Sequence, residues 1–358
     1  MNTIATTPPI DQLLRAQAPV CIGCSGGKDS CAVAFATLAH LDAIGHQGPR
    51  ILMHADLGVV EWKDSAPTCA RLADRLGLEL VTVRRKAGDM MERWEGRWHN
   101  NVERYINLEC VKLILPWSTA SMRFCTSELK TDVMCADLVK RFPQSTILSV
   151  SGIRREESSK RKRAPVLKAQ PKLTSKKWET SGYGWNPLLE WKLPQVLGYL
   201  EAQRFELHEA YRVFKSSRVS CCFCILASEA DLAAAASCPD NADIYRRMVD
   251  LEIASSFAFR ERDWLGDVRP ALLTPEQVEG LARAKAVARV RAEVESAIPD
   301  HLLYEKGWPT CVPTWAEAEL LCRVRRTVAA AVGLEVRFTT PGELIDRYQE
   351  LMDAKIAA

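Results

Sequence analysis

Six consecutive residues near the start of the chain have the types and spacing of an anion-binding loop. An apolar run at 20–24 precedes them and a mostly apolar stretch at 29–44 follows, which predicts a buried strand, a tight turn and a helix. Two glycines let the backbone approach an anion closely, and the first turn of the helix offers free N–H groups. Asp29 could cap that helix or help to hold Mg²⁺; a plain Gly-Gly turn with Ser and Asp capping is the alternative interpretation. The predicted phosphate site comprises Ser25, Gly26, Gly27, Lys28, Asp29 and Ser30.

Cysteines give the second chemical signal, with 13 in 358 residues. Cys221 and Cys224 have the spacing that lets two thiolates reach one metal centre. The chain shows neither a secretory leader nor an apolar run of the ~20 residues that a membrane span needs, which predicts a cytoplasmic protein without a membrane partner. Clustered thiols there indicate metal, redox or sulfur chemistry. Five other cysteines fall in apolar patterns and are predicted to pack in the core: Cys21, Cys24, Cys31, Cys69 and Cys135.

A third feature is the polar segment 154–184, which carries ten basic residues between Arg154 and Lys177 but only two acidic ones. Three aromatic residues lie near its end, the last of them Trp185. We predict a long loop here. It would serve as a lid over bound phosphates, as a nucleic-acid contact or simply as a solvated loop.

The elements that must position these residues follow an alternating pattern. Apolar runs predict strands, and amphipathic or apolar stretches between them predict helices, which together indicate an α/β fold with a doubly wound parallel sheet. Ligands in such sheets bind beyond the carboxyl ends of the strands. Strands are predicted at 20–24, 51–54, 78–83 and 145–150, and helices at 29–44, 61–76, 127–142 and 194–202.

The rest of the chain predicts helices at 241–252, 275–297 and 314–332. The predicted division is a nucleotide-binding domain at 1–235 and a mainly helical C-terminal region at 236–358. The apolar fraction of 47% and charged fraction of 26% exclude a disordered chain, a collagen-like fibre and a coiled-coil rod. A net charge of 48 − 45 = +3 is too small to indicate a nucleic-acid partner by itself.

The loop SGGKDS resembles the signature of the PP-loop ATP pyrophosphatases, which have the adenine nucleotide α-hydrolase-like fold and cleave ATP between the α- and β-phosphates. Five further segments, in the same order, resemble the phosphoadenylyl-sulfate (PAPS) reductase-like branch. That branch stands near the ATP sulfurylase small subunit and the sulfurtransferase of DNA phosphorothioation. The segments are HADLGVVEW (54–62), RFCTSELK (123–130), SGIRREESSKR (151–161), NPLLEW (186–191) and SRVSCCFCI (217–225).

The resemblance implies roles for individual residues. Residues 25–30 would hold the phosphates of ATP, with Asp56 and Gly58 near the adenosine or the Mg²⁺. Gly152, Arg154 and Arg155 would lie at the mouth of the site, where two arginines can neutralise a pyrophosphate leaving group. A solvated Arg pair balanced by Glu156 and Glu157 is the alternative. The implied catalytic residues are Lys28, Asp29, Arg154 and Arg155.

The resemblance also implies a set of metal ligands, because the family packs the RFCT segment near the Cys-x-x-Cys. Four sulfurs would hold a [4Fe–4S] cluster or, as the alternative, Zn²⁺; Cys222 is a substitute ligand or a sulfur carrier. The other interpretation is that these cysteines bind no metal and pack as buried structural thiols. The implied ligands are Cys125, Cys221, Cys224 and Cys238. APS reductases carry paired cysteines where this chain has Cys125-Thr126.

The sequence therefore predicts an enzyme that cleaves ATP to AMP and pyrophosphate and so adenylates an acceptor, which then receives sulfur. The intact phosphate loop favours this reaction, since PAPS reductases proper usually carry a degraded loop. Their attacking cysteine also has no counterpart in the tail ELIDRYQELMDAKIAA. The alternatives are a sulfonucleotide (PAPS or APS) reductase and a non-catalytic nucleic-acid-binding accessory or regulatory protein. The expected partners are an adenine nucleotide, a sulfur donor such as a cysteine desulfurase, and a nucleic-acid acceptor held by residues 154–185.

Overall fold

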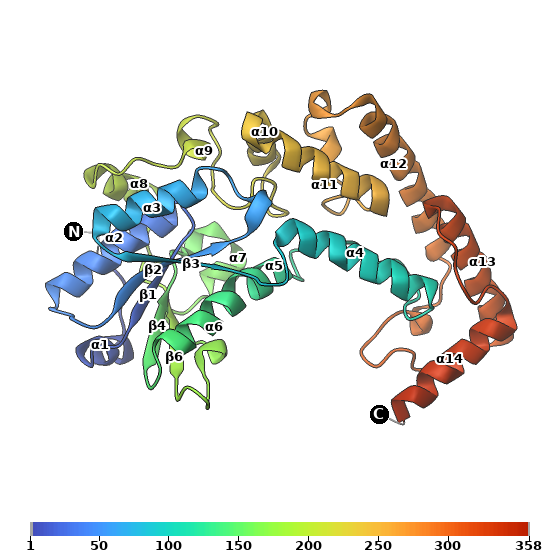
Figure 1. Ribbon diagram of the computed structural model, residues 1–358, viewed down its shortest axis with the longest axis horizontal. Helices are drawn as coiled ribbons and strands as arrows, with labels where there is room; N and C mark the ends of the chain where they lie inside the picture. Colours follow the sequence, from blue (N-terminus) through green and yellow to red (C-terminus); the bar gives the residue numbers. More distant parts are fainter. Residues whose placement is uncertain (1–2, 357–358) are drawn as a thin grey trace. The chain divides into compact units, whose positions relative to one another are not determined.

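A six-stranded sheet is the centre of the first of two units in the structure, a computed structural model that describes residues 3–356. The strand order is β3-β2-β1-β4-β6-β5 (Figure 1). All neighbouring strands are parallel except β5 and β6, which pair antiparallel. The predicted α/β class with a doubly wound parallel sheet is therefore confirmed. The strands are β1 (Val20–Cys24), β2 (Arg50–Asp56), β3 (Glu79–Arg84), β4 (Thr146–Val150), β5 (Leu167–Ala169) and β6 (Ser181–Trp185).

The strand order reverses beside β1, because the chain runs from β1 outward to β2 and β3 and then returns to β4 on the other side of β1. The carboxyl ends of β1 and β4 therefore flank the crevice where doubly wound sheets bind ligands. The helices of this unit are α1 (Pro8–Arg15), α2 (Lys28–Ala43), α3 (Ser65–Leu76), α5 (Phe124–Thr126), α6 (Asp132–Arg141), α7 (Ser159–Lys162), α8 (Leu193–Ala202), α9 (Glu209–Arg212) and α10 (Glu229–Ser237).

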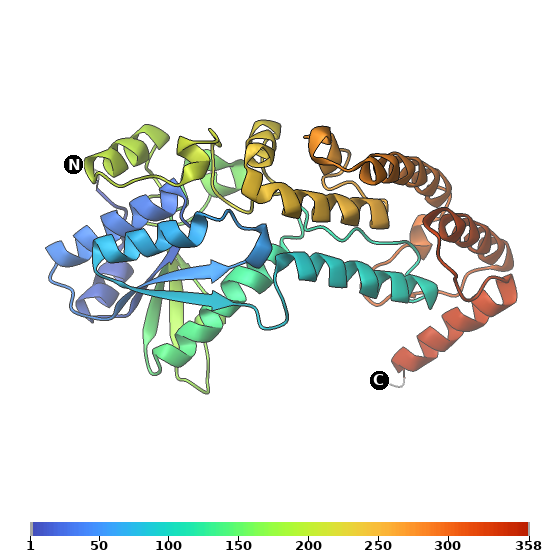
Figure 2. The ribbon, with the colours of Figure 1, turned by 45° about the horizontal axis from the view of Figure 1, so that its top comes forward.

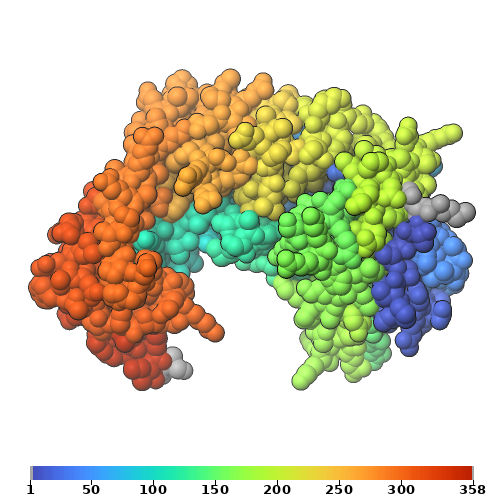
Figure 3. Space-filling model, turned by 180° about the vertical axis from the view of Figure 1, so that it is seen from behind, coloured from blue at the N-terminus to red at the C-terminus, as the bar shows by residue number. Residues whose placement is uncertain are grey.

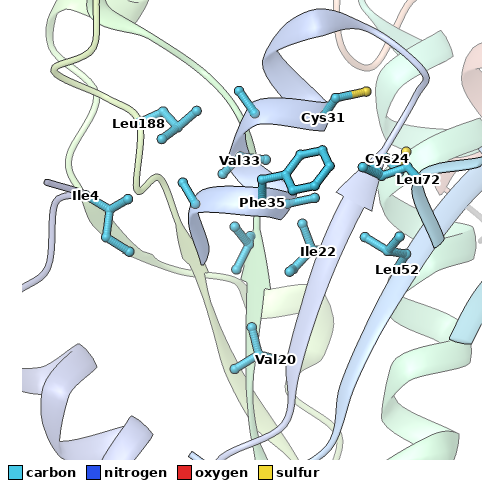
Figure 4. Packing of buried hydrophobic residues seen from close by; sticks show 14 of the residues in the cluster. Ile4, Val20, Ile22, Cys24, Cys31, Val33, Phe35, Leu52, Leu72 and Leu188 are labelled. Atoms are coloured by element: carbon cyan, nitrogen blue, oxygen red, sulfur yellow. The ribbon is translucent and has the colours of Figure 1, made fainter. Parts of the chain in front are cut away.

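Two apolar cores cover the two faces of the sheet, since successive residues of a strand point to opposite faces. On β1, Ile22 joins the core that α2 and α3 cover, where Val33 and Phe35 of α2 also lie (Figure 4). Cys21 joins the opposite core, beneath α6. The structure confirms that all five cysteines predicted to pack are buried.

The segment predicted as a long loop is shorter than expected, because residues 181–185 form β6 in parallel register with β4. The sequence did not predict this strand because it contains two glycines, and glycine is depleted in strands. Gly182 is required for close approach: a Cβ there would lie 2.5 Å from the Leu173 side chain and 2.8 Å from Ile147 O. The basic part before β5 lies, in green, at the surface of the first unit (Figure 3).

The second unit is helical and is built from two separate stretches of chain, Met91–Thr119 and the described residues from Ala242 onward. The sequence placed the first stretch in the nucleotide-binding domain, but in the structure it packs with the second unit. Aromatic side chains explain this, because the Trp117 ring lies 5.2 Å from that of Phe259 and Trp117 Nε1 donates to Phe257 O at 3.2 Å. The helices are α4 (Met90–Ile106), α11 (Ala242–Ser255), α12 (Pro275–Glu295), α13 (Trp315–Val332) and α14 (Pro341–Ile356).

Helix α4 runs beside α11 in both ribbon views (Figures 1 and 2). Arg247 of α11 holds the Glu95 carboxylate of α4 through two hydrogen bonds of 2.7 and 2.8 Å. Arg325 of α13 is buried and donates to Tyr105 O at 2.9 Å. Residues 91–119 are therefore bonded to both α11 and α13 of the later stretch. No helix within residues 3–356 combines the length and the apolar character that crossing a membrane requires.

Candidate functional site

The predicted phosphate loop lies where the sequence placed it, between the end of β1 and the first turn of α2. Gly26 has a φ of +73°, which glycine adopts without strain, and Gly27 is the N-cap of α2. Ser30 Oγ donates to Gly27 O at 2.8 Å and accepts from Ser25 N–H at 3.2 Å. These bonds hold the loop folded against the N-terminus of a helix of 16 residues, whose positive dipole end favours an anion.

A segment from α9 to residue 219 covers the start of α2. Tyr211 Oη accepts hydrogen bonds from the backbone N–H groups of Lys28 at 3.2 Å and Val219 at 3.1 Å. Lys28 Nζ donates to Ser217 O at 3.1 Å and lies 5.3 Å from the centre of the Tyr211 ring. The loop thus already presents an N–H group to an acceptor oxygen, as it would to a phosphate. Sequence reasoning missed Tyr211, and no local pattern marks it.

Arg154, predicted at the mouth of the site, is buried and tied to the phosphate loop. Its Nε donates to Asp29 Oδ1 at 2.6 Å, and its Nη1 pairs with Glu156. Asp29 also lies 3.2 Å from Lys28 Nζ. Burial lowers the pKa of Arg154, but the Asp29 carboxylate outweighs it, so the pKa is raised overall. Arg154 therefore acts first as a clamp between the end of β4 and the start of α2.

Arg155 points elsewhere. Its Nε pairs with Glu190 at 2.6 Å, and its Nη1 donates to Lys162 O and Ala164 O. The structure therefore does not bring Arg155 to the phosphate loop beside Arg154. Consecutive residues of an extended backbone point in opposite directions, and Arg154 is extended with φ −126° and ψ 147°.

Gly152 makes the closest approach between β4 and the loop. A Cβ at this position would lie 2.4 Å from Asp29 O, which is backbone and cannot swing away. We expect Gly152→Ala to lower the free energy of unfolding by about 3 kcal/mol. Gly198→Ala is the matched control, since its Cβ would meet nothing within 4 Å in α8 and should stabilise by roughly 0.5–1 kcal/mol. Urea denaturation compares the two; equal stability of Gly152→Ala and the wild type would contradict the close approach.

Asp56 and Gly58, which the resemblance implies are near the adenosine or the Mg²⁺, lie at the carboxyl end of β2. Asp56 Oδ1 accepts from Gly58 N–H at 2.7 Å, and its side chain is 33% exposed. Gly58 has a φ of +76° and packs against Asp89, where a Cβ would lie 2.3 Å from Oδ2. Arg84 lies within 3.8 Å of Asp56 and 3.6 Å of Asp89. The predicted pair is therefore part of a larger polar group, whose other members, Arg84 and Asp89, the sequence did not reveal.

His208 is fully buried against the phosphate loop. Its Nδ1 accepts from Ala210 N–H at 3.0 Å, capping α9, and its Nε2 lies 3.3 Å from Ser65 Oγ. A Cβ on Gly26 would lie 3.3 Å from the His208 ring. Burial lowers the pKa of His208 from 6.5 to about 4, so the imidazole is neutral in the folded protein at neutral pH.

The stability of this region should fall as the medium is acidified. Below pH 6.5 His208 takes up a proton in the unfolded chain, whereas in the folded chain it stays neutral down to about pH 4. The free energy of unfolding therefore falls as the pH is lowered from about 6.5 to about 4. The loss from His208 should approach about 1.4 kcal/mol per pH unit. Urea denaturation of the wild type and of His208→Gln at a series of pH values measures it. Identical pH slopes for the two proteins would show that His208 does not titrate as expected.

The predicted metal ligands do not come together as a set. Cys224 and Cys125 lie near Cys221, whose pKa burial raises to about 12, whereas Cys238 lies near Cys222. Cys222 Sγ is itself engaged, donating to Asn241 Oδ1 at 3.0 Å. Within residues 3–356, no three His, Cys, Asp or Glu side chains are placed to hold a metal ion. The described side chains therefore do not form the predicted [4Fe–4S] or Zn²⁺ site as one set of four sulfurs.

The cysteine segment nevertheless adjoins the nucleotide side of the sheet. Glu61 and Cys221 form an antiparallel bridge, and Cys222 N–H donates to Val60 O at 2.8 Å. Cys125, Cys221 and Cys224 are each partly exposed. The backbone of Cys221 and Cys222 thus lies against Val60 and Glu61, which follow Asp56 and Gly58 in the sequence.

A family model and a solved structure are similar to parts of this chain. Residues 19–225, more than half of the chain, match the phosphoadenosine phosphosulfate reductase domain. Among solved structures, the chain is similar to phosphoadenylyl-sulfate (PAPS) reductase from Candida auris in a phosphate complex, with 14% sequence identity and a TM-score of 0.36. That similarity covers 61% of this chain and 97% of the other. No curated protein matches the chain. The matched domain contains the phosphate loop, Gly152 and Tyr211.

Proposed function

Because the chain belongs to the phosphoadenosine phosphosulfate reductase family, we propose that it is an enzyme of adenine nucleotides that cleaves ATP to AMP and pyrophosphate. The cleavage adenylates an acceptor, which then receives sulfur. The observation that carries the proposal is the complete loop of residues 25–30, folded by the Ser25–Ser30 hydrogen bond at the N-terminus of α2. An ATP-cleaving enzyme needs such a loop to hold the β- and γ-phosphates.

In this reaction an acceptor oxygen attacks the α-phosphorus, and the bond from that phosphorus to the β-phosphate oxygen breaks. Lys28 Nζ and the N–H groups at the start of α2 stabilise the charge that develops on the leaving pyrophosphate. A phosphate oxygen would replace Tyr211 Oη as the acceptor of the Lys28 N–H bond. Arg154 holds the Asp29 carboxylate and so keeps the first turn of α2 in place.

The carboxylates present fit a nucleotide-borne Mg²⁺ at one position. Mg²⁺ is bound mainly by substrate phosphates and water, with one or two protein carboxylates. Asp56, one third exposed at the end of β2, would supply one, while Asp29 is already neutralised by Lys28 and Arg154. When bound, the ion would neutralise charge on the triphosphate.

Sulfur then replaces AMP on the acceptor: the outer sulfur of a cysteine persulfide forms a carbon–sulfur bond as the carbon–oxygen bond to AMP breaks. A second thiol then attacks the inner sulfur, so that the persulfide S–S bond breaks, the thiolated product leaves and a protein disulfide forms, which an external dithiol reduces. The partly exposed thiols of Cys125, Cys221 and Cys224 would receive the persulfide sulfur from a donor such as a cysteine desulfurase. The basic segment is only partly available to a nucleic-acid acceptor, because four of its charges are paired with carboxylates: Arg154, Arg155, Arg161 and Lys172.

The decisive experiment supplies the reduced protein with ATP and Mg²⁺, alone and with total tRNA or duplex DNA, and measures AMP and pyrophosphate. A parallel reaction supplies PAPS with a dithiol and measures sulfite. Equal amounts of AMP and pyrophosphate would support the proposal. Sulfite without ATP cleavage would favour the sulfonucleotide reductase, which the family membership also supports. Failure to bind either nucleotide in calorimetry would overturn both.

A further inference from the structure

Two buried thiols touch directly beneath the phosphate loop. Cys24 is the last residue of β1 and precedes Ser25, and Cys69 lies in α3. Their Sγ atoms are 3.1 Å apart. Figure 4 shows Cys24 at the end of β1 beside Leu72 of the same helix α3. A residue of β1 and a residue of α3, 45 positions apart in the sequence, are thus in contact through their sulfur atoms.

The surroundings favour one thiolate in this pair. His54 Nδ1 donates to Cys24 O at 3.1 Å and lies 3.7 Å from Cys69 Sγ, while its Nε2 lies 3.1 Å from Glu61 Oε2. The hydrogen bond with Cys69, against the effect of burial, lowers the pKa of Cys24, and the backbone N–H of Gly26 lowers it further. The thiolate is the reactive form of cysteine, and Cys24 is the one of the two that solvent reaches, so Cys24 is assigned as the nucleophile of the pair.

We propose that Cys24 and Cys69 are a redox modification site, in which a peroxide oxidises the two thiols to a disulfide directly beneath the phosphate loop. The geometry carries the proposal, because a disulfide needs the sulfurs at about 2.05 Å and they must approach by only about 1 Å. Cys31 is also buried nearby, on α2, but its sulfur makes no such contact with Cys24.

The chemistry balances with one peroxide molecule. The Cys24 thiolate attacks a peroxide oxygen, which gives a sulfenic acid and, after protonation, one water. The Cys69 sulfur then attacks the Cys24 sulfur, the S–S bond forms, and the hydroxyl leaves with the thiol proton as a second water. Each sulfur loses one electron and the peroxide gains two. A water-sized oxidant suits a pair of which only Cys24 retains any exposure, at 5%.

The disulfide should weaken phosphate binding; this consequence rests on the proposed function. Cys69 lies one turn after Ser65 on α3, and a Cβ on Gly26 would lie 3.1 Å from Ser65 O. A shift of Cys24 toward α3 therefore pushes Gly26 of the phosphate loop against the backbone of Ser65, where the contact is already close. We expect the affinity for ATP to fall on the order of tenfold, which is within the usual range of coupling between two sites.

The first test treats the full-length, reduced wild-type protein with hydrogen peroxide and maps its peptides without reduction. The proposal expects one cross-linked peptide pair containing Cys24 and Cys69, two hydrogens lighter and restored by dithiothreitol. Linkage of Cys24 to Cys31, or oxidation of the partly exposed cysteines while Cys24 and Cys69 stay reduced, would overturn it. This test needs no variant and therefore does not depend on whether a substituted core folds.

Two variants sharpen the assignment. Cys69→Ala should abolish the cross-link and leave a Cys24 sulfenic acid that dimedone traps, whereas the matched control Cys31→Ala should keep the cross-link. Calorimetry with ATP then compares oxidised and reduced wild type. Equal affinity would refute the effect on the loop, while no binding by the reduced protein would refute the proposed function and leave the peptide map to decide the disulfide.

Discussion

Replacing Arg154 with methionine should lower the free energy of unfolding of the first unit by about 3 kcal/mol. The guanidinium is buried, and its removal leaves the Asp29 carboxylate with Lys28 as its remaining ionic partner. Breaking a buried ion pair from one side costs about 3–5 kcal/mol, and the Lys28 contact places the effect at the lower end. Hydrogen exchange of peptides from residues 20–35 measures the free energy of opening where the clamp acts.

Arg155→Met is the matched control, because it is the adjacent residue and its charge pairs with the exposed Glu190. An exposed ion pair contributes about 0–1 kcal/mol, so Arg155→Met should change the exchange of residues 20–35 little. Equal effects of the two substitutions would show that Arg154 does not clamp the loop. The comparison also separates two roles of Arg154. Loss of a positioning role changes the hydrogen exchange of the nucleotide-free protein, whereas loss of leaving-group stabilisation does not.

Lys28→Ala should lower ATP-dependent pyrophosphate release by about 100-fold or more. Lys28 supplies the positive side chain at the start of α2, where its Nζ lies between Asp29 and Ser217 O. Removing one preorganised donor to developing charge costs about 10²–10³ in rate. Pyrophosphate release under the conditions of the wild type measures the effect, and Lys63→Ala is the control, since Lys63 is exposed and pairs with the exposed Asp240.

Normal turnover of Lys28→Ala would refute the assignment of the phosphate site to residues 25–30. A loss of activity with a matching loss of protection in residues 20–35 would instead point to the structural contacts of Lys28. Lys28→Met separates these cases, because it keeps an unbranched apolar side chain of similar length and removes the charge together with the hydrogen bond to Ser217 O.

Much of the fold was predictable because its signals are local. Strand β1 was predicted with its observed bounds, and α12 and α13 were predicted within two residues at each end. Strand β6 was not predictable, since Gly182 is required by its contacts with the Leu173 side chain and with Ile147 O, which belongs to the distant strand β4. Helix α4 was missed for a similar reason: its place is set by aromatic packing with residues near 257–259.

The site divides in the same way. The phosphate loop could be predicted, because residues adjacent in sequence build it. The partners that complete it could not, since Tyr211 and His208 reach it from a segment about 180 residues later. The direction of side chains was also hidden: Arg154 and Arg155 look alike in sequence, yet one holds Asp29 and the other holds Glu190. The resemblance implied four metal-binding thiols, but Cys125, Cys221 and Cys224 lie near one another, whereas Cys238 lies near Cys222.

The discontinuous second unit bears on how the protein is made. During synthesis, residues 91–119 leave the ribosome well before the residues from 242 onward that will cover Trp98 and Trp117. The nascent chain must therefore carry these indole rings unburied while the sheet of the first unit is completed, a condition that invites chaperone binding or aggregation. In a chain cut after residue 235, the rings of Trp98 and Trp117 would remain unburied. Any shortened version that retains α4 should thus need the whole of the later helical stretch to stay in solution.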